Sequence, residues 1–305
     1  MAFTAKDVQA LRERTGCGMM DCKKALTEAD GDFERAVEIL RERGLAAQAK
    51  KASRIAAEGV VYAISDENVG VIIEVNSETD FVAKNDKFMK FVDAAARAVM
   101  KYNPASVEEL MACDGGEGTI EEMLRERILT IGENIKIRRF ERLEGVTVPY
   151  IHMGGVYATL VKFDVDPAFA KNEEFLTFGK DIAMQVAAIS PQYLDKDSVP
   201  SDVLEKEKEI RIAQLKEDPK NANKPQNILE KIILGGLGKY YKEVCLLEQP
   251  FVKDDKSSVS DYVNSVSKKL GTPIAVTQFV RYEKGEGLEK RNEDFAAEVA
   301  AQIKH

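Results

Sequence analysis

The chain has 305 residues, of which 44% are apolar and 31% charged, and its formal net charge is −8. This length and apolar content are enough to bury a sizeable core and to form two or more domains. The acidic balance argues against direct binding of nucleic acid, which requires a basic surface. No apolar run is long enough to span a bilayer, and no charged-then-apolar signal segment stands at the start. We therefore expect a cytoplasmic protein without a membrane partner.

Residue types that commonly carry catalysis are scarce. The two histidines, His152 and His305, do not suggest an acid/base pair or a metal triad. The four cysteines are too few and too scattered for a disulfide framework, and they lack the spacing of a zinc site, so we expect them reduced and structural. At Gly238-Lys239, Ile233 and Tyr240 replace the first glycine and the hydroxyl that a phosphate-binding loop needs. The sequence predicts no catalytic residue, no metal and no cofactor.

The N-terminal part predicts three short helices, over residues 4–14, 20–28 and 32–44. Asp32 is expected to cap the third helix and Gly44 to end it, before a helical linker over residues 46–57. This layout is that of a ubiquitin-associated-like domain, a small module that usually binds another protein. Beside its glycine turn, Met19 and Met20 form either an adaptable contact surface or part of the core.

The middle of the chain contains a duplicated strand-then-helix unit. The segment Val82-Ala83-Lys84-Asn85 recurs 87 residues later as Phe169-Ala170-Lys171-Asn172, and Glu58-Gly59 recurs as Glu144-Gly145. At the same helical offset, apolar residues match in the pairs Phe88 and Phe175, Phe91 and Phe178, Ala96 and Ala183, and Val99 and Val186. Both copies are therefore expected to pack a helix on a strand pair in the same way.

The start of each repeated helix carries capping signals. In the second copy, Asp166-Pro167 predicts an N-cap followed by proline at the first helical position. By the offset, Thr79 is then expected to cap the first helix. Asp80 becomes its first residue, with a carboxylate beside the positive end of the helix dipole, and Phe81 its second.

The copies differ at Phe81. The second copy has Ala168 opposite Phe81 and Phe169 opposite Val82, so Val82 or Phe169 already fills the apolar slot. Phe81 is a surplus aromatic at a helix tip, and we expect it to contact a partner. The alternative is that Phe81 is a core residue on the face of Phe88, seven positions further on.

The remaining pattern predicts strands over residues 60–64, 69–75, 135–140, 147–152, 156–164 and 274–282, and helices over residues 80–101, 106–130, 167–188, 260–270 and 292–303. Helices over Ser201–Lys216 and Gln226–Lys242 are expected to form an antiparallel hairpin projecting from the core. That hairpin is either a solvated surface element or a device that pairs protomers or docks a partner. The apolar stripe of Phe295 and Val299 on the last helix indicates docking, on the core or on a partner.

Together these elements predict an α+β fold. It comprises an N-terminal three-helix ubiquitin-associated-like bundle with its linker (residues 1–53) and a core of two duplicated sheet-plus-helix subdomains (residues 54–142 and 143–283). A protruding antiparallel helical hairpin is inserted at about residues 195–242, and a C-terminal module with one helix covers residues 284–305.

With these residues assembled, the chain closely resembles the translation elongation factor Ts family, the guanine nucleotide exchange factors of elongation factor Tu. Several long motifs in the family's order carry the resemblance: Leu11-Arg12-Glu13-Arg14-Thr15-Gly16, Met19-Met20-Asp21-Cys22-Lys23-Lys24-Ala25-Leu26, Thr79-Asp80-Phe81-Val82, Ile131-Gly132-Glu133-Asn134-Ile135, Gln249-Pro250-Phe251-Val252 and Asp294-Phe295-Ala296-Ala297-Glu298-Val299. The family more often has a Glu-Gly-Arg run where this chain has Leu234-Gly235-Gly236-Leu237-Gly238, and these glycines are expected to weaken the hairpin helix.

The resemblance implies a partner and the residues that meet it. Elongation factor Tu would be bound with GDP or free of nucleotide, and Thr79, Asp80, Phe81 and Val82 would dislodge its Mg²⁺. It implies further partner contacts at Arg12, Met19, Met20, Ile131, Gly132, His152, Phe295 and Val299. A dimer of such heterodimers is a further expectation. The alternative function is a non-catalytic adaptor or scaffold that only binds proteins.

Overall fold

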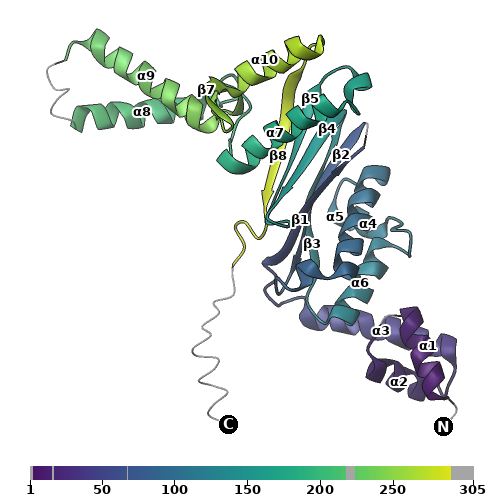
Figure 1. Cartoon of the computed structure of the whole chain (residues 1–305). Helices are drawn as coiled ribbons and strands as arrows, with labels where there is room; N and C mark the ends of the chain where they lie inside the picture. The colour runs from purple at the N-terminus through teal and green to yellow at the C-terminus, as the bar shows by residue number, and fades with distance from the viewer. Residues whose placement is uncertain (1–2, 16, 67, 218–223, 290–305) are drawn as a thin grey trace.

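The computed structural model describes residues 3–15, 17–66, 68–217 and 224–289. It is a mixed α+β structure in which a helical bundle, a two-sheet core and a helical hairpin follow one another from end to end (Figure 1). The α-helices are α1 (Ala5–Thr15), α2 (Met19–Glu28), α3 (Phe33–Lys51), α4 (Asp86–Tyr102), α5 (Val107–Ala112), α6 (Ile120–Ile131), α7 (Glu173–Ile189), α8 (Ser201–Glu217), α9 (Gln226–Val244) and α10 (Val259–Leu270). Short 3₁₀ helices are η1 (Val82–Lys84), η2 (Pro167–Phe169) and η4 (Leu246–Glu248).

The described strands pair antiparallel. They are β1 (Glu58–Ser65), β2 (Val69–Ser77), β3 (Lys136–Glu144), β4 (Val146–His152), β5 (Tyr157–Asp164), β6 (Pro250–Phe251), β7 (Asp254–Ser258) and β8 (Ala275–Glu283). One three-stranded sheet has the order β1-β2-β3 and another has the order β4-β5-β8, while β6 and β7 form a small ribbon. Each larger sheet therefore consists of one copy of the repeated hairpin and one further strand.

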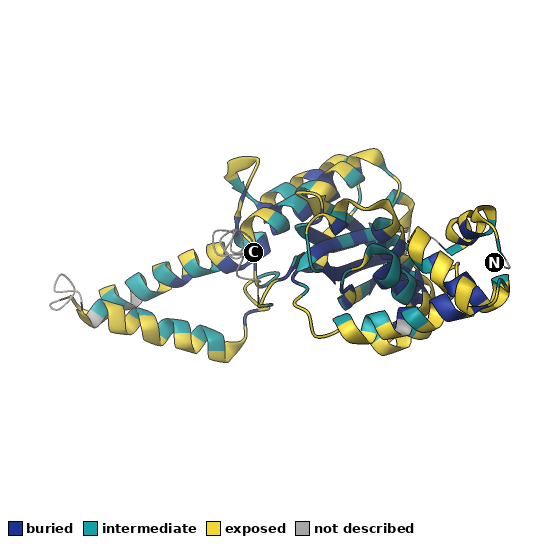
Figure 2. Cartoon of the chain, turned by 90° about the horizontal axis from the view of Figure 1, so that it is seen from below, coloured by how far each residue is buried: buried dark blue, intermediate teal, exposed yellow. Residues whose placement is uncertain are grey.

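The two larger sheets pack back to back, and helices cover their outer faces. The apolar layer between the sheets contains Val61 and Ile72 from one side and Leu160 and Val280 from the other. α4, α5 and α6 pack on the outer face of the first sheet, and α7 and α10 on that of the second. Because β2 is covered on both faces, nearly all of its side chains are buried. Figure 2 shows this burial concentrated in the sheets.

The duplication is visible in the helices that cover the sheets. α4 and α7 each have 17 residues, and Asn85 and Asn172 cap them by accepting hydrogen bonds from two backbone N–H groups of the first turn. Both helices end at a residue with left-handed backbone, Asn103 and Ser190. Phe88, Phe91, Phe175 and Phe178, which the repeat aligns in pairs, are all among the largest fully buried side chains.

The prediction that Gly44 ends the third helix is wrong, because α3 continues through it to Lys51. Gly44 faces α6, where a Cβ would lie 3.7 Å from the carbonyl oxygen of Arg125. Packing of α3 on α6 outweighs the helix penalty of glycine, which is about 1 kcal/mol. The expected continuous helix over residues 106–130 is instead divided into α5 and α6, and a capping box at Thr119 starts α6.

The hairpin of α8 and α9 projects from the core at the end opposite to the N-terminal bundle (Figure 1). The glycines expected to weaken α9 do not interrupt it, since this helix runs through Gly235, Gly236 and Gly238. A Cβ at Gly236 would lie 2.8 Å from a guanidinium nitrogen of Arg211 on α8. Because Gly236 has no side chain, the guanidinium group of Arg211 fits between α8 and α9.

The C-terminal helix predicted over residues 292–303 lies outside the described residues, and so do Phe295 and Val299. Among the residues that are described, no helix is both long and apolar enough to cross a membrane. The four cysteines are free, as expected; Cys17, Cys22 and Cys245 are buried and Cys113 is half-buried.

Candidate functional site

The segment that leaves β2 forms a short tip before α4, consisting of Thr79, Asp80, Phe81 and Val82, of which Asp80 and Phe81 are exposed. The expectation that Thr79 caps a helix starting at Asp80 is wrong. Asp80 and Phe81 form a turn that leads into η1, and α4 begins only at Asp86. The Thr79 side chain points instead toward Glu133, and its hydroxyl donates to that carboxylate at 2.6 Å between Oγ1 and Oε1.

In the second copy, the predicted cap is present but belongs to a shorter element. The Asp166 side chain accepts a hydrogen bond from Ala168 N–H at 2.9 Å, with Pro167 at the first position, as expected. Asp166 caps only η2, and the long helix α7 starts seven residues after it, at Glu173. Both copies therefore have a 3₁₀ helix before the α-helix. In each copy an asparagine, Asn85 or Asn172, follows the 3₁₀ helix and caps the α-helix.

Phe81 is 78% exposed, and its neighbour Asp80 is exposed as well. Val82 is buried in the core of the first subdomain, and its counterpart Phe169 is half-buried against the core of the second. The apolar slot of the repeat is thus filled by Val82 or Phe169, as predicted, and Phe81 is not a core residue. An exposed aromatic beside an exposed carboxylate suits a contact with another molecule.

The tip rests on a polar platform built from residues far apart in the sequence. Glu133 accepts from the Thr79 N–H at 2.9 Å, and Asn134 donates its backbone N–H to Glu78 at 2.6 Å. Arg54, in the linker after α3, lies 3.3 Å from the Glu78 carboxylate. Sequence analysis singled out Ile131 and Gly132 in this motif and missed Glu133. The available signal was a carboxylate directly after a helix-ending glycine.

The other candidate contacts are on the surface at several places. Met19 and Met20 are 44% and 61% exposed on α2, so they are surface rather than core residues. Arg12 on α1 and Gly132 at the end of α6 are exposed, whereas Ile131 is half-buried. The structure brings Ile131 and Gly132 close to the tip through the adjacent Glu133, and leaves Arg12, Met19 and Met20 on the N-terminal bundle.

His152 is the exposed last residue of β4, directly before the turn into β5. Its Nδ1 is 3.0 Å from the Tyr150 hydroxyl, which fixes the ring. The same turn contacts the first sheet, because Val61 N–H donates to the Gly155 carbonyl at 2.8 Å. β1 begins beside the end of β2, from which the tip emerges. His152 and the tip therefore lie toward the same end of the core.

The chain after β8 also passes this end. Lys284 pairs with Glu58 at the start of β1, and Gly285 has a positive φ of 67°. A Cβ at Gly285 would lie 2.3 Å from the Ala57 carbonyl oxygen, so only glycine fits here. The last described residues thus leave the core beside the linker of the N-terminal bundle.

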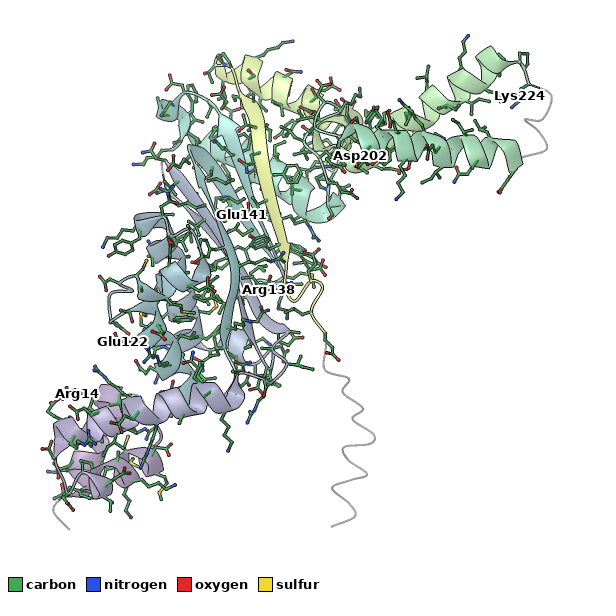
Figure 3. All side chains as sticks on the ribbon, turned by 180° about the vertical axis from the view of Figure 1, so that it is seen from behind. Arg14, Glu122, Arg138, Glu141, Asp202 and Lys224 are labelled. Carbon is green, nitrogen blue, oxygen red and sulfur yellow. The ribbon has the colours of Figure 1, made fainter. Side chains whose placement is uncertain are left out.

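A buried carboxylate, that of Glu74, binds the chain where it leaves the core after β8. Glu74 on β2 is fully buried, accepts from Gly285 N–H at 2.8 Å, and pairs with Arg138 and Arg139 at 3.0 and 2.7 Å. Burial acts to raise the pKa of Glu74, but the hydrogen bonds from Gly285, Asn76 and both arginines outweigh it and hold the pKa below its ordinary value. Figure 3 shows Arg138 on β3, beside β8.

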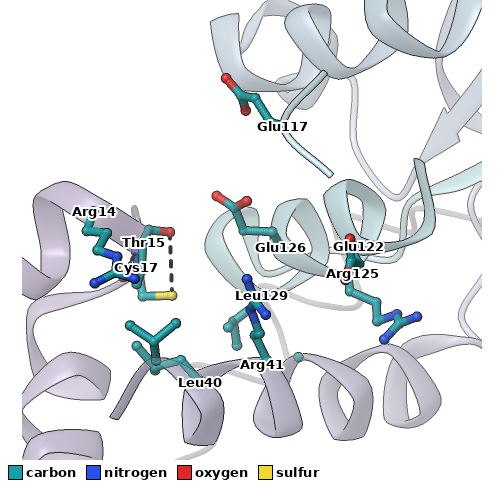
Figure 4. A pocket seen from close by; sticks show the side chains of 12 residues that line it. Arg14, Thr15, Cys17, Leu40, Arg41, Glu117, Glu122, Arg125, Glu126 and Leu129 are labelled. Atoms are coloured by element: carbon teal, nitrogen blue, oxygen red, sulfur yellow. Dashed lines mark hydrogen bonds between the residues drawn. The ribbon is translucent and has the colours of Figure 1, made fainter. Parts of the chain in front are cut away.

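A cavity of about 430 Å³ lies at the seam between the N-terminal bundle and the core (Figure 4). Arginines and glutamates alternate on its walls: Arg14, Arg41, Arg125, Glu117, Glu122 and Glu126. Cys17 also lines it, and burial raises the pKa of this thiol, which keeps it protonated and unreactive. Among the described residues, no group of three or more histidine, cysteine or acidic side chains is placed to hold a metal ion.

The family model "Elongation factor TS" matches residues 78–286. The elongation factor Ts of Trichlorobacter lovleyi is 49% identical over 310 aligned positions, which cover 99% of this chain and 98% of the relative. The elongation factors Ts of Clostridium kluyveri and Clostridium perfringens strain SM101 are 50% and 49% identical, and each covers at least 98% of both chains.

A two-sheet core with an exposed aromatic tip, next to a helical bundle with exposed methionines, is typical of a protein-binding factor. The matches show which one: this chain belongs to the elongation factor Ts family. Membership implies a role as a nucleotide exchange factor in translation elongation.

Proposed function

We propose that this protein binds elongation factor Tu in its GDP-bound form, promotes release of GDP by disturbing the Mg²⁺ site of that partner, and leaves the site open to GTP. The observation that carries the proposal is the exposure of Phe81, which is 78%, in a position where the second copy has only alanine. The core does not need this side chain. A role in contact with a partner explains why one copy has it and the other does not.

The proposed mechanism needs no chemical catalysis. A protein that binds the nucleotide-free partner more tightly than the nucleotide-bound one weakens nucleotide binding by the same factor, because the two equilibria are linked. Mg²⁺ neutralises charge between the nucleotide phosphates, so displacing it loosens the nucleotide. In this role Phe81 acts as a wedge, Asp80 perturbs the surroundings of the ion by its charge, and the buried Val82 anchors the wedge in the core.

The proposed partner surface is extended. It includes the tip with Ile131 and Gly132, the end of β4 with His152, and the bundle with Arg12, Met19 and Met20. The second half of the core would hold the third domain of the partner. Phe295 and Val299, which lie outside the described residues, would clasp the nucleotide domain. Because the chain after β8 leaves the core at the same end as the tip, that assignment is compatible with the described geometry.

The proposal also covers the domain division, the pairing of complexes and the location of the protein. The division into residues 1–53, 54–142, 143–283 and 284–305 assigns partner contacts to the bundle, to each core half and to the C-terminal module. The hairpin of α8 and α9, with Leu234 exposed at 66%, is proposed to pair two complexes into a dimer of heterodimers. We also propose that the protein acts in the cytoplasm without touching nucleic acid directly.

The test is release of fluorescently labelled GDP from purified elongation factor Tu at fixed Mg²⁺ concentration. The unmodified protein should accelerate release strongly, and Phe81→Ala should reduce the acceleration about tenfold or more, since hot-spot aromatics contribute roughly 2 kcal/mol or more. Tyr102→Ala is the matched control, because Tyr102 is also an exposed aromatic residue but lies at the other end of α4, away from the tip. Equal rates for Phe81→Ala and Tyr102→Ala would contradict the wedge.

A further inference from the structure

We propose that Glu133 is a positioning residue for nucleotide exchange, which holds the tip in the orientation that meets the partner. The proposal rests on the function proposed for the tip. Asp80 and Phe81 are exposed, so the direction in which they point depends on how the residues at either side are held. On one side Val82 is buried in the core, and on the other Thr79 is held by Glu133.

Every polar group of Thr79 is engaged. Its N–H donates to Glu133 Oε2 at 2.9 Å, and its hydroxyl donates to Glu133 Oε1 at 2.6 Å. Its carbonyl accepts from the Ser77 hydroxyl at 2.9 Å. Both oxygens of one carboxylate therefore bind one residue, which restrains rotation as well as position. Hydrogen bonds to an ionised acceptor are also among the stronger ones in proteins.

Glu133 itself stands on a rigid support. It follows Gly132, which ends α6 in the left-handed conformation, and α6 is packed into the core through side chains such as Ile128. The end of a helix disfavours a carboxylate, because the helix dipole is negative there. Lys51 offsets this charge by donating to the Ile128 carbonyl at 3.3 Å. The two hydrogen bonds from Thr79 stabilise the Glu133 carboxylate at this position.

The second copy of the repeat gives an independent comparison. Asp166 stands where the first copy has Thr79, and it satisfies the backbone locally by accepting from Ala168 N–H. That turn, without an exposed aromatic, is capped by its own residue. The turn that carries Phe81 is held instead from another element, by a residue 54 positions away in the sequence. The copy with the exposed phenylalanine is therefore the copy whose turn is held by a residue from another element.

The experiment compares Glu133→Ala, Glu133→Gln and the unmodified protein in two assays. The first is hydrogen exchange of the backbone amides around Thr79, which needs no partner. The second is GDP release from elongation factor Tu, measured also in the Phe81→Ala background. Glutamine can accept from the Thr79 N–H and donate to its hydroxyl, so it should rescue. Glu144→Ala is the control, because Glu144 is exposed and pairs with Arg142 at the far end of β3.

We expect Glu133→Ala to speed amide exchange at Thr79 and to slow GDP release roughly tenfold, with both effects reversed in Glu133→Gln. In the Phe81→Ala background, Glu133→Ala should change release by less than about twofold, because both substitutions act through one side chain. Unchanged amide exchange, or additive effects on release, would overturn the proposal. If the unmodified protein did not accelerate release, the proposed function would fail, while amide exchange would still decide whether Glu133 holds the tip.

Discussion

Two phenylalanines seven positions apart give the sharpest test of how the tip is built. Phe88 is fully buried between α4 and the first sheet, and Phe81 is 78% exposed. Full burial of a phenylalanine removes about 200 Å² from water, which at about 25 cal/mol per Å² corresponds to about 5 kcal/mol. Phe81 buries roughly a fifth of that area, so its contribution to the free energy of unfolding is at most about 1 kcal/mol. Phe88→Ala should cost about 3–5 kcal/mol.

The assay is urea unfolding of both alanine variants and of the unmodified protein, followed by circular dichroism. Phe81→Ala should leave the midpoint almost unchanged, and Phe88→Ala should lower it markedly without changing the slope. If Phe81→Ala lost 3 kcal/mol or so, as Phe88→Ala is expected to do, Phe81 would be a core residue. The inference that its side chain is available to a partner would then be wrong.

Three further predictions concern the core. Glu74→Gln should lower stability by about 2 kcal/mol at neutral pH, because it removes the buried negative charge that pairs with Arg138 and Arg139. Since the folded pKa of Glu74 is depressed, its contribution is full above its unfolded value near 4.5 and disappears as pH falls through the folded value, so acid titration of stability should be flatter in the variant. Gly59→Ala should be severely destabilising in thermal unfolding, because φ is +106° and the new Cβ would lie 2.2 Å from the Val75 carbonyl oxygen. Asn85→Ala and Asn172→Ala should each cost about 1 kcal/mol in urea, and unequal losses would argue against equivalent caps.

Much of the core could be predicted because it follows from local periodicity. The apolar spacing in α4 and α7 fixes which face is buried, and comparing the copies separates Val82, which the core needs, from Phe81, which it does not. The same comparison misplaced the helix start. A threonine is a good N-cap in isolation, and nothing near Thr79 in the sequence reveals that Glu133 holds its side chain or that Asp80 and Phe81 form a turn.

The features that sequence reasoning missed depend on contacts between distant segments. Gly44 is a helix-ending residue by propensity, yet the packing of α3 against α6 keeps the helix intact. Glu74 lies in a predicted strand, but its partners come from β3 and from the chain after β8. A buried glutamate in an apolar strand is the signal that would have indicated such a cluster.

The two back-to-back sheets share no strand. β1, β2 and β3 precede Gly145, and β4, β5 and β8 follow it, so a single cut at this glycine leaves both sheets whole. The molecule therefore consists of two related halves joined by one chain connection. The apolar layer between their sheets resembles a subunit interface. Separately produced halves should therefore reassociate without a linker. The same architecture is what fusion of an ancestral homodimer would leave behind, with one half free to keep the aromatic tip and the other free to lose it.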